Sequence, residues 1–299
     1  MGTAGSMTTS AGGAGAAPTG RHYRMRFRRR PIIALGVVVL GAAVALTVLL
    51  INRNGPLQSA SAFCTAGTGD STFVFTPEQT QNAAIISSVA STVGLPDHAV
   101  TVGLVTALQE SKLRNLSYGD RDSIGLFQQR PSQGWGTAQQ IASPTYAATA
   151  FFTALRKISG WETLDVAVAA QKVQRSADGT AYQQWEPKAR ALAVALTGQQ
   201  PASLRCEGGT VTFHQSAGVT TSSIQTALGA DGFAPGASAQ LGWRTVSYLI
   251  ANAYADGITS VSYAGQTWTE ARGTWKPDTK STPTTGVTFT VAKDPRTNA

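Results

Sequence analysis

The chain has 299 residues, of which 42% are hydrophobic and 13% are charged. This composition is typical of folded globular proteins and excludes a chain that is disordered throughout. The formal net charge is +8, from 24 Lys and Arg against 16 Asp and Glu. What this excess means depends on where the basic residues lie.

The excess positive charge is concentrated at the N-terminus. Residues 1–30 carry no acid and six arginines, which are Arg21, Arg24, Arg26, Arg28, Arg29 and Arg30. The rest of the chain has 18 basic against 16 acidic side chains. Nucleic-acid binding needs basic residues clustered on the folded part, so we predict no nucleic-acid partner. Because residues 1–20 are mostly Gly, Ala, Ser and Thr, we predict a disordered cytoplasmic arm over residues 1–30.

An uncharged apolar run follows this arm. Pro31–Ile51 is long enough, as a helix, to cross a hydrocarbon core of about 30 Å. The positive-inside rule places the N-terminus in the cytoplasm and everything after Ile51 outside. We therefore predict a single-pass protein of the cell membrane, with its membrane contact through this one helix. The alternative is a signal peptide cleaved at Ala60-Ser61-Ala62, although apolar signal cores usually run for about 7–15 residues.

Two cysteines bracket the next part of the chain. Residues 52–74 are largely polar and are predicted to be a linker. Disulfides persist outside the membrane, so we expect Cys64 and Cys206 to form a bridge that joins the two ends of one compact domain. Two buried free thiols are the alternative.

The residues between the cysteines have the apolar spacing of helices. Thr76-Pro77-Glu78-Gln79 is a capping-box start with Pro at the first helical position. A second helix is predicted to begin near Asp97, which places Glu110 in its last turns. Later helices are predicted at Pro144–Ile158, Glu162–Arg175 and Glu186–Thr197.

The position of Glu110 indicates a chemical role. A carboxyl group at a helix C-terminus meets the unfavourable end of the helix dipole, and apolar cover from Leu108 and Phe127 removes hydration. Both effects raise the pKa of the carboxyl group, so that it can protonate the leaving oxygen of a glycosidic bond. The alternative is a solvent-exposed Glu110 that pairs with Lys112 or Arg114.

A local motif favours the catalytic interpretation. Glu110-Ser111 followed by Gly125-Leu126-Phe127-Gln128 resembles the lysozyme-like lytic transglycosylases, in which an acid and a Ser end a helix and a Gly-Leu-(apolar)-Gln turn lines the cleft. Gly119-Asp120-Arg121 also resembles goose-type lysozymes, which share that fold. The resemblance covers roughly residues 75–198 and implies a mostly α-helical lysozyme-like domain over residues 75–206.

The resemblance assigns roles to individual residues. It implies that Glu110 is the general acid, that Ser111 orients it, and that Gly125 and Gln128 shape the saccharide site. Trp135 lies in a Gly-rich loop after the motif, and we predict that it forms a wall of the cleft. Other aromatic residues are candidates for stacking on sugar rings or for packing, namely Tyr118, Tyr146, Trp161, Tyr182 and Trp185.

The second catalytic carboxylate is less defined. Goose-type lysozymes have an Asp just after the Gly-Leu-(apolar)-Gln turn, where this chain has Gln129-Arg130. We predict that Asp120 holds the water of an inverting hydrolysis, with Asp122 in reserve and a loop contact to Arg121 as the alternative for both. A transglycosylase does not need that water, because a hydroxyl group of the substrate attacks. The Ala-Tyr-Asn-Ala-Gly run of transglycosylases is also replaced here, by Ala169–Gln174.

After Cys206 the pattern changes to helices mixed with short strands. Helices are predicted at Ser222–Leu228 and Gln240–Ala255, and strands at Ser260–Tyr263, Gln266–Thr269 and Val287–Ala292. We therefore predict a small α+β domain over residues 207–299, and α+β as the fold class of the chain.

The segment Gly242–Trp268 resembles a C-terminal module of secreted cell-wall proteins that is related to zinc D-Ala-D-Ala peptidases. Those enzymes bind zinc through His and Asp, and Val287-Thr288-Phe289-Thr290 stands where active relatives have a His-x-His pair. The module is therefore interpreted as a non-catalytic cell-wall-binding or spacing domain. His22, His98 and His214 share no ligand spacing, so we predict neither a metal site nor a cofactor.

Two functions follow from these observations. The first is a membrane-anchored muramidase or lytic transglycosylase that cleaves the β-1,4 glycan bond of peptidoglycan through Glu110. The second is a non-catalytic protein that binds peptidoglycan glycan strands within a cell-wall or conjugation assembly, which the departures at Arg130 and Gln171 motivate. The sequence does not indicate an oligomeric state.

Overall fold

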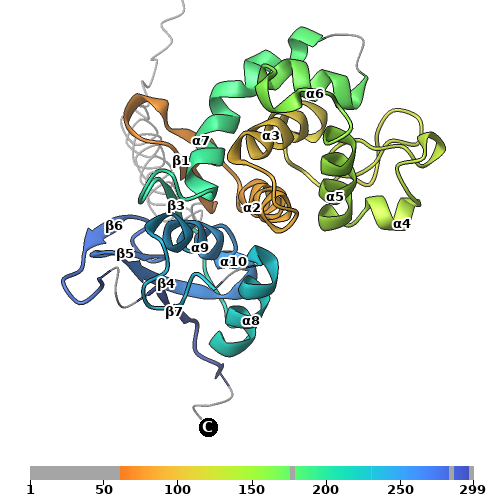
Figure 1. Cartoon of the computed structure of the whole chain (residues 1–299). Coiled ribbons are helices and arrows are strands. Elements are labelled where there is room, and N and C mark those ends of the chain that lie inside the picture. Colours follow the sequence, from red (N-terminus) through yellow and green to blue (C-terminus); the bar gives the residue numbers. More distant parts are fainter. Residues whose placement is uncertain (1–60, 176–178, 230, 283–285, 296–299) are drawn as a thin grey trace, which may run out of the picture. The chain divides into compact units, whose positions relative to one another are not determined.

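The structure is a computed structural model that describes residues 61–175, 179–229, 231–282 and 286–295 (Figure 1). These residues all belong to one compact unit, which spans residues 58–299. Its secondary structure is α+β, with helices in the first part and helices with a second sheet in the last part.

The predicted fold class is corrected on one point, the membrane-spanning helix. No helix within the described ranges is long and apolar enough to cross a bilayer. The longest of them, α2 (Pro77–Thr92), has 16 residues, which at about 1.5 Å per residue falls short of a hydrocarbon core of about 30 Å. Residues 1–30 and 31–51, on which the predicted arm and the predicted membrane helix fell, lie outside the described residues.

A three-stranded antiparallel sheet carries the disulfide. Its strands are β1 (Phe63–Ala66), β2 (Phe73–Phe75) and β3 (Leu204–Glu207), in the order β2-β1-β3. Cys64 and Cys206 lie directly opposite each other in the pairing of β1 with β3. They form a disulfide with 3.9 Å between their Cα atoms, which confirms the predicted bridge.

This sheet also includes part of residues 52–74, the predicted linker. The structure places residues 63–66 of the predicted linker in β1 and residues 73–74 in β2, with a 3-10 turn at Gly69–Ser71 between the strands. Strands of three and four residues are too short for an alternating apolar pattern, so the sequence gives little sign of them.

The helical layer is arranged around α3 (Asp97–Ser111). Every residue of α3 from Ala99 to Leu108 is buried, as expected for a helix that is apolar on all sides. Five elements pack against α3, which are α2, α5 (Pro144–Leu155), α6 (Val166–Gln174), α7 (Glu186–Leu196) and the 3-10 helix η4 (Gly179–Trp185). The predicted capping box starts α2, because Gln79 N donates to Thr76 Oγ1 while Thr76 N donates to Gln79 Oε1. Shorter elements complete the layer, namely η2 (Pro131–Gln133), α4 (Ala138–Ile141) and η3 (Trp161–Thr163).

The last part of the fold combines three helices with a four-stranded antiparallel sheet in the described residues. The helices are α8 (Ala217–Leu228), α9 (Ala239–Ala251) and α10 (Ala253–Asp256). The strands, in the order β6-β5-β4-β7, are β4 (Ile258–Tyr263), β5 (Gln266–Thr269), β6 (Trp275–Pro277) and β7 (Thr288–Val291). The predicted helix Gln240–Ala255 is therefore interrupted at Asn252, which caps α9.

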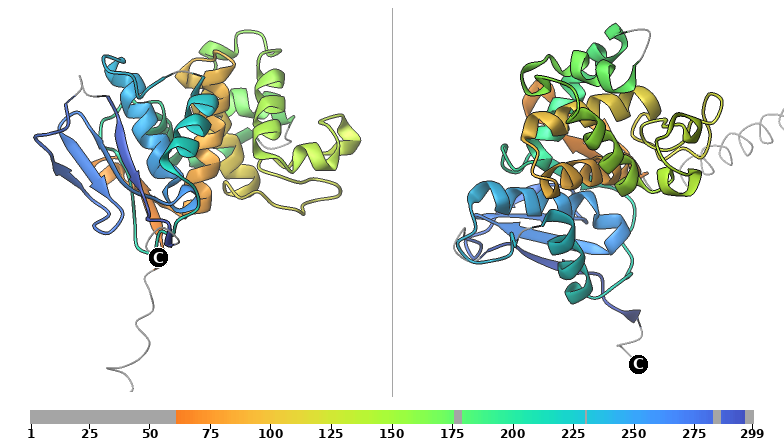
Figure 2. Two further views of the ribbon diagram at one scale, coloured as in Figure 1. Left: turned by 90° about the horizontal axis from the view of Figure 1, so that it is seen from below. Right: turned by 45° about the vertical axis from the view of Figure 1, so that its right-hand side comes forward.

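Helix α9 joins this part to the rest of the unit (Figure 2). It packs against β4 on one side and against α2 and α7 on the other. Two indole groups add hydrogen bonds to β3, because Trp268 Nε1 donates to the carbonyl of Cys206 at 3.1 Å and Trp275 Nε1 donates to the carbonyl of Leu204 at 2.9 Å. The predicted boundary at residues 206–207 is thus crossed by one buried and one partly buried hydrogen bond, and the two-domain division stays a prediction.

The disulfide gives a first testable prediction. Replacing Cys64→Ala and Cys206→Ala together should lower the free energy of unfolding by about 2–5 kcal/mol, because the bridge closes a segment of 142 residues. Urea-induced unfolding measures this change. As a control, reductant should destabilise the wild type and leave the double variant unchanged. Equal stability of the oxidised wild type and the variant would contradict the prediction.

Candidate active site

Glu110 lies at the point where the buried helix α3 reaches the protein surface. Its side chain is partly buried, whereas Ala107 and Leu108 before it are fully buried. Tyr182 Oη donates a hydrogen bond to Glu110 Oε1 at 2.8 Å, and the side-chain amide of Gln174 donates a second one. The carboxyl group is therefore held by η4 and by the last residue of α6. Both elements are distant from Glu110 in the sequence.

The environment of Glu110 shifts its acidity. Burial is the largest effect and raises the pKa of the Glu110 carboxyl above its ordinary value. The hydrogen bonds from Tyr182 and Gln174 and the positive charge of Lys112 act in the opposite direction, because each of them stabilises the carboxylate. The net result is a raised pKa together with donors that can stabilise the charged form when it appears.

Ser111 fastens the end of α3 to the turn that follows. It is buried, and its hydroxyl group lies 2.7 Å from the carbonyl oxygen of Leu126 and 3.1 Å from that of Ala107, both of which accept hydrogen bonds. The predicted role of orienting Glu110 is therefore indirect here, through the position of the helix end. Ser111 acts on the backbone of the Gly-Leu-Phe-Gln turn.

Gly125 is required by the geometry of that turn. Its φ is +79°, and its amide donates to the carbonyl of Leu116 at 2.7 Å. A Cβ atom at this position would lie 2.8 Å from the carbonyl oxygen of Ile141. Ile124 and Gln129 pair across the turn as an isolated antiparallel bridge. Gly125 thus lets the turn lie against the end of α4.

Gln128 and Phe127 hold the turn in place. Gln128 Nε2 donates to the carbonyl oxygens of Tyr118 and Gly125, each at 3.3 Å, so its amide braces the loop. The ring of Phe127 is buried and stacks on Phe151 with 4.6 Å between centroids. Its carbonyl oxygen accepts a hydrogen bond from Gln174 Nε2 at 2.8 Å. Gln174 therefore connects the turn to Glu110.

The two candidate second carboxylates lie in the preceding loop. The side chain of Asp120 is 91% exposed, and its ion-pair partner is Arg121 Nε at 3.9 Å. Asp122 accepts from Arg130 Nε at 2.7 Å, from Ser132 N at 2.8 Å and from Ser132 Oγ at 3.0 Å. The Arg130 guanidinium and these donors hold the pKa of Asp122 well below its usual range. Asp122 therefore braces the loop through Arg130 and Ser132, and Asp120 faces solvent.

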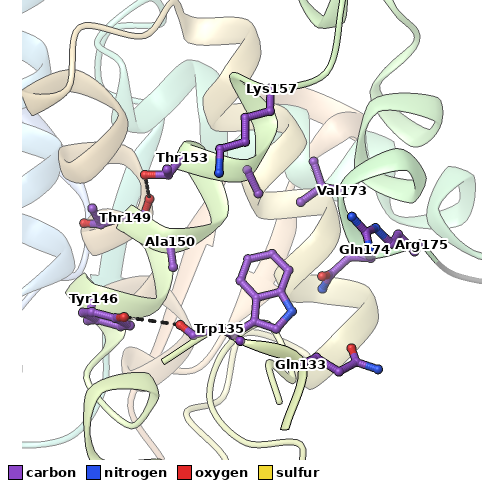
Figure 3. Close-up of a pocket in the computed structure, with 12 residues that line it drawn as sticks. Gln133, Trp135, Tyr146, Thr149, Ala150, Thr153, Lys157, Val173, Gln174 and Arg175 are labelled. Carbon is purple, nitrogen blue, oxygen red and sulfur yellow. Dashed lines mark hydrogen bonds between the residues drawn. The ribbon is translucent and has the colours of Figure 1, made fainter. Parts of the chain in front are cut away.

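A groove lies beside this site (Figure 3). It has a volume of about 780 Å³ and is lined by the loop around Trp135, by α5 and by the end of α6. Trp135, the predicted cleft wall, lines it, and its carbonyl oxygen accepts from Tyr146 Oη at 3.3 Å. Glu110 is not among the lining residues. Gln174 lines the groove and contacts Glu110, so it joins the two.

The remaining aromatic candidates have structural surroundings. Trp161 is buried and stacks on His98 at 6.1 Å between centroids. Trp185 Nε1 donates to Gln109 Oε1 at 2.7 Å, and Lys112 Nζ lies 4.2 Å from the centroid of its ring. Tyr118 is 67% exposed on the loop before the turn. Within the part of the chain that the structure describes, no group of three His, Cys, Asp or Glu side chains is placed to hold a metal ion.

Sequence reasoning missed two residues of the site, Gln174 and Tyr182. The sequence indicates Tyr182 only as a packing or sugar-stacking residue, whereas its hydroxyl group contacts Glu110 in the structure. Gln174 ends the segment that replaces the Ala-Tyr-Asn-Ala-Gly run, and this departure was the available signal. Both contacts bridge more than sixty positions of sequence, so no local pattern could reveal them.

In comparisons with known proteins, no family model matches this chain, and no curated protein matches it in sequence. A carboxyl group with a raised pKa, two donors to its charged form and an adjoining aromatic-lined groove can supply a proton to a bound substrate and take one back.

The contact with Tyr182 predicts a change in acidity. Tyr182→Phe removes a donor that stabilises the carboxylate, so the pKa of Glu110 should rise further. NMR titration of protein labelled with ¹³C at the glutamate carboxyl measures this shift. Tyr118→Phe, at an exposed tyrosine of the neighbouring loop, should leave the Glu110 titration unchanged. An unchanged or lowered pKa in a folded Tyr182→Phe variant would count against the described site.

The turn predicts a difference between two glycines. Gly125 and Gly134 have φ of +79° and +80°, but a Cβ atom at Gly134 would meet nothing within 4 Å. Both substitutions to Ala should cost about 1–2 kcal/mol for the left-handed backbone. Gly125→Ala should cost more than Gly134→Ala, because it also collides with Ile141. Urea-induced unfolding measures the free energy of unfolding of both variants. An equal loss in Gly125→Ala and Gly134→Ala would show that the turn is not closely packed.

Proposed function

We propose that this protein cleaves the β-1,4 glycan bond of peptidoglycan, with Glu110 as the general acid. The observation that carries the proposal is the surroundings of Glu110. Its pKa is raised by burial, and Gln174 joins it to a groove of about 780 Å³ with an aromatic wall at Trp135. Glycosidic cleavage needs a protonated carboxyl group at the leaving oxygen, and sugar rings commonly stack on aromatic side chains.

The proposed reaction uses the Glu110 carboxyl group twice. In the first step it gives its proton to the glycosidic oxygen, the bond between that oxygen and the sugar C1 breaks, and positive charge develops at C1. The carboxylate left behind accepts hydrogen bonds from Tyr182 and Gln174. In the second step a hydroxyl group attacks C1 and its proton passes to Glu110, which restores the acid.

The loop carboxylates favour transglycosylation over inverting hydrolysis. An inverting enzyme holds a water between two carboxyl groups that are about 6.5–9.5 Å apart. Asp120 is turned toward solvent, and Asp122 is engaged by Arg130 and Ser132. A lytic transglycosylase needs no such carboxylate, because the C6 hydroxyl group of the substrate attacks and leaves a 1,6-anhydro end.

The disulfide supports an extracytoplasmic location, where peptidoglycan lies. Disulfides are rare in reducing cytosol and persist outside it, and Cys64–Cys206 is fully buried. We further propose that the last part of the fold is a non-catalytic wall-binding or spacing module. Its strand β7 carries Thr288, Phe289 and Thr290 where the resembled peptidases have zinc-binding histidines.

Loss of cleavage in Glu110→Gln is the test of the proposed function. This substitution keeps the shape and hydrogen bonding of the side chain but cannot supply a carboxylic proton, so release of muropeptides should fall by about 10²–10⁴-fold. Sedimentation with peptidoglycan should be retained. Glu162→Gln, at an exposed acid outside the site, should release muropeptides like the wild type.

The products and the failures of this test are also informative. Anhydro-ended muropeptides indicate transglycosylation, whereas reducing ends indicate hydrolysis. Wild-type protein that binds peptidoglycan but releases nothing, where a control muramidase is active, would replace cleavage by a binding function. Full activity of Glu110→Gln would remove Glu110 from the reaction.

A further inference from the structure

The charged side chains that line the groove beside Glu110 are both positive. Lys157 and Arg175 line it, and the other described lining residues are neutral. Both side chains are exposed, and neither has an ion-pair partner within the described part of the chain. Figure 3 shows Lys157 on the side of α5 and Arg175 beside Gln174 at the end of α6, with the ring of Trp135 between them.

The two cations follow two different helices. Lys157 follows the end of α5, and Arg175 directly follows α6 with a left-handed φ of 54°. Helices α5 and α6 pack against each other, which fixes the two chain positions relative to the groove. Trp135 extends between the two walls in the same view (Figure 3).

We propose that Lys157 and Arg175 bind carboxylate groups of a glycan strand, so that the groove selects anionic over neutral glycans. The inference rests on the proposed function, because it names the substrate feature that the same groove recognises. A carboxylate is the ligand that fits, since a guanidinium can bind it through two parallel hydrogen bonds and an ammonium as a point charge. The ring of Trp135 leaves an apolar surface for the uncharged sugar between them.

A structural role is the competing explanation for these cations. Lysine and arginine at helix C-termini interact favourably with the helix dipole, and both residues lie just beyond such ends. That role affects stability and does not distinguish between ligands. Selective loss of affinity for carboxylate-bearing strands is therefore the readout that separates the two explanations.

The carboxylates of peptidoglycan have two sources. Strands with intact stem peptides carry the carboxylates of the peptide, whereas strands stripped by an amidase carry the lactyl carboxylate of muramic acid. Chitin hexasaccharide has β-1,4-linked N-acetylglucosamine and no carboxylate. These three ligands share the backbone that the groove would bind and differ in the group that the cations would recognise.

The experiment measures binding in full-length protein that carries Glu110→Gln, so that the result does not depend on cleavage. Adding Lys157→Gln and Arg175→Gln should weaken binding of at least one carboxylate-bearing strand by about tenfold, and should leave chitin hexasaccharide within about twofold. Loss for stem-bearing strands assigns the peptide, and loss for stripped strands assigns the lactyl group. Arg114→Gln with Arg190→Gln changes the net charge equally at exposed positions outside both the groove and the last part of the fold, and should have no effect.

Other outcomes would overturn the inference. These are unchanged binding of both carboxylate-bearing strands, an equal loss for chitin, or no binding of any carboxylate-bearing strand to the parent protein. Cleavage by the wild type with no carboxylate preference would leave the proposed function standing and remove this inference. Selective binding of carboxylate-bearing strands without cleavage would leave this inference standing and remove the proposed cleavage.

Discussion

Burial of α3 along its length is the constraint on which the rest of the structure depends. Because α3 is covered from Ala99 to Leu108, helices and the 3-10 segment η4 must surround it. The chain can place an ionisable group on this helix only where the cover ends, and Glu110 is at that point. The core therefore fixes the position of the acid and removes part of its hydration, which raises its pKa.

The contacts around Glu110 balance this effect. Desolvation favours the protonated form, whereas Tyr182, Gln174 and Lys112 favour the charged form. A general acid gives up a proton and takes one back in each cycle, so both its protonated and its charged form must be accessible. Desolvation supports the first form, and the contacts support the second. The same residues join the surrounding elements, because Gln174 also binds the carbonyl of Phe127 while Ser111 binds that of Leu126.

How far the sequence predicts this structure depends on whether a feature is local. The capping box at Thr76 and the place of Glu110 near a helix end follow from nearby residues, and the Cys64–Cys206 bridge follows from an even cysteine count. The contact of Tyr182 with Glu110 spans 72 positions and depends on how η4 packs against α3, which periodicity does not encode. The pairing of β1 with β3 and the indole hydrogen bonds to β3 are hidden for the same reason, as their partners lie far along the chain. The membrane-spanning helix of the predicted fold class has no counterpart among the described helices.

The proposed function requires that the end of α3 presents an acid to a glycan held in the neighbouring groove. The most direct test is a crystal structure of the Glu110→Gln variant with a bound peptidoglycan fragment of four or more sugars. The account predicts a glycosidic oxygen within hydrogen-bond distance of the position-110 side chain, with the chain of sugars continuing along Trp135 beside Lys157 and Arg175. A fragment bound elsewhere on the protein, with no sugar near that side chain, would contradict it.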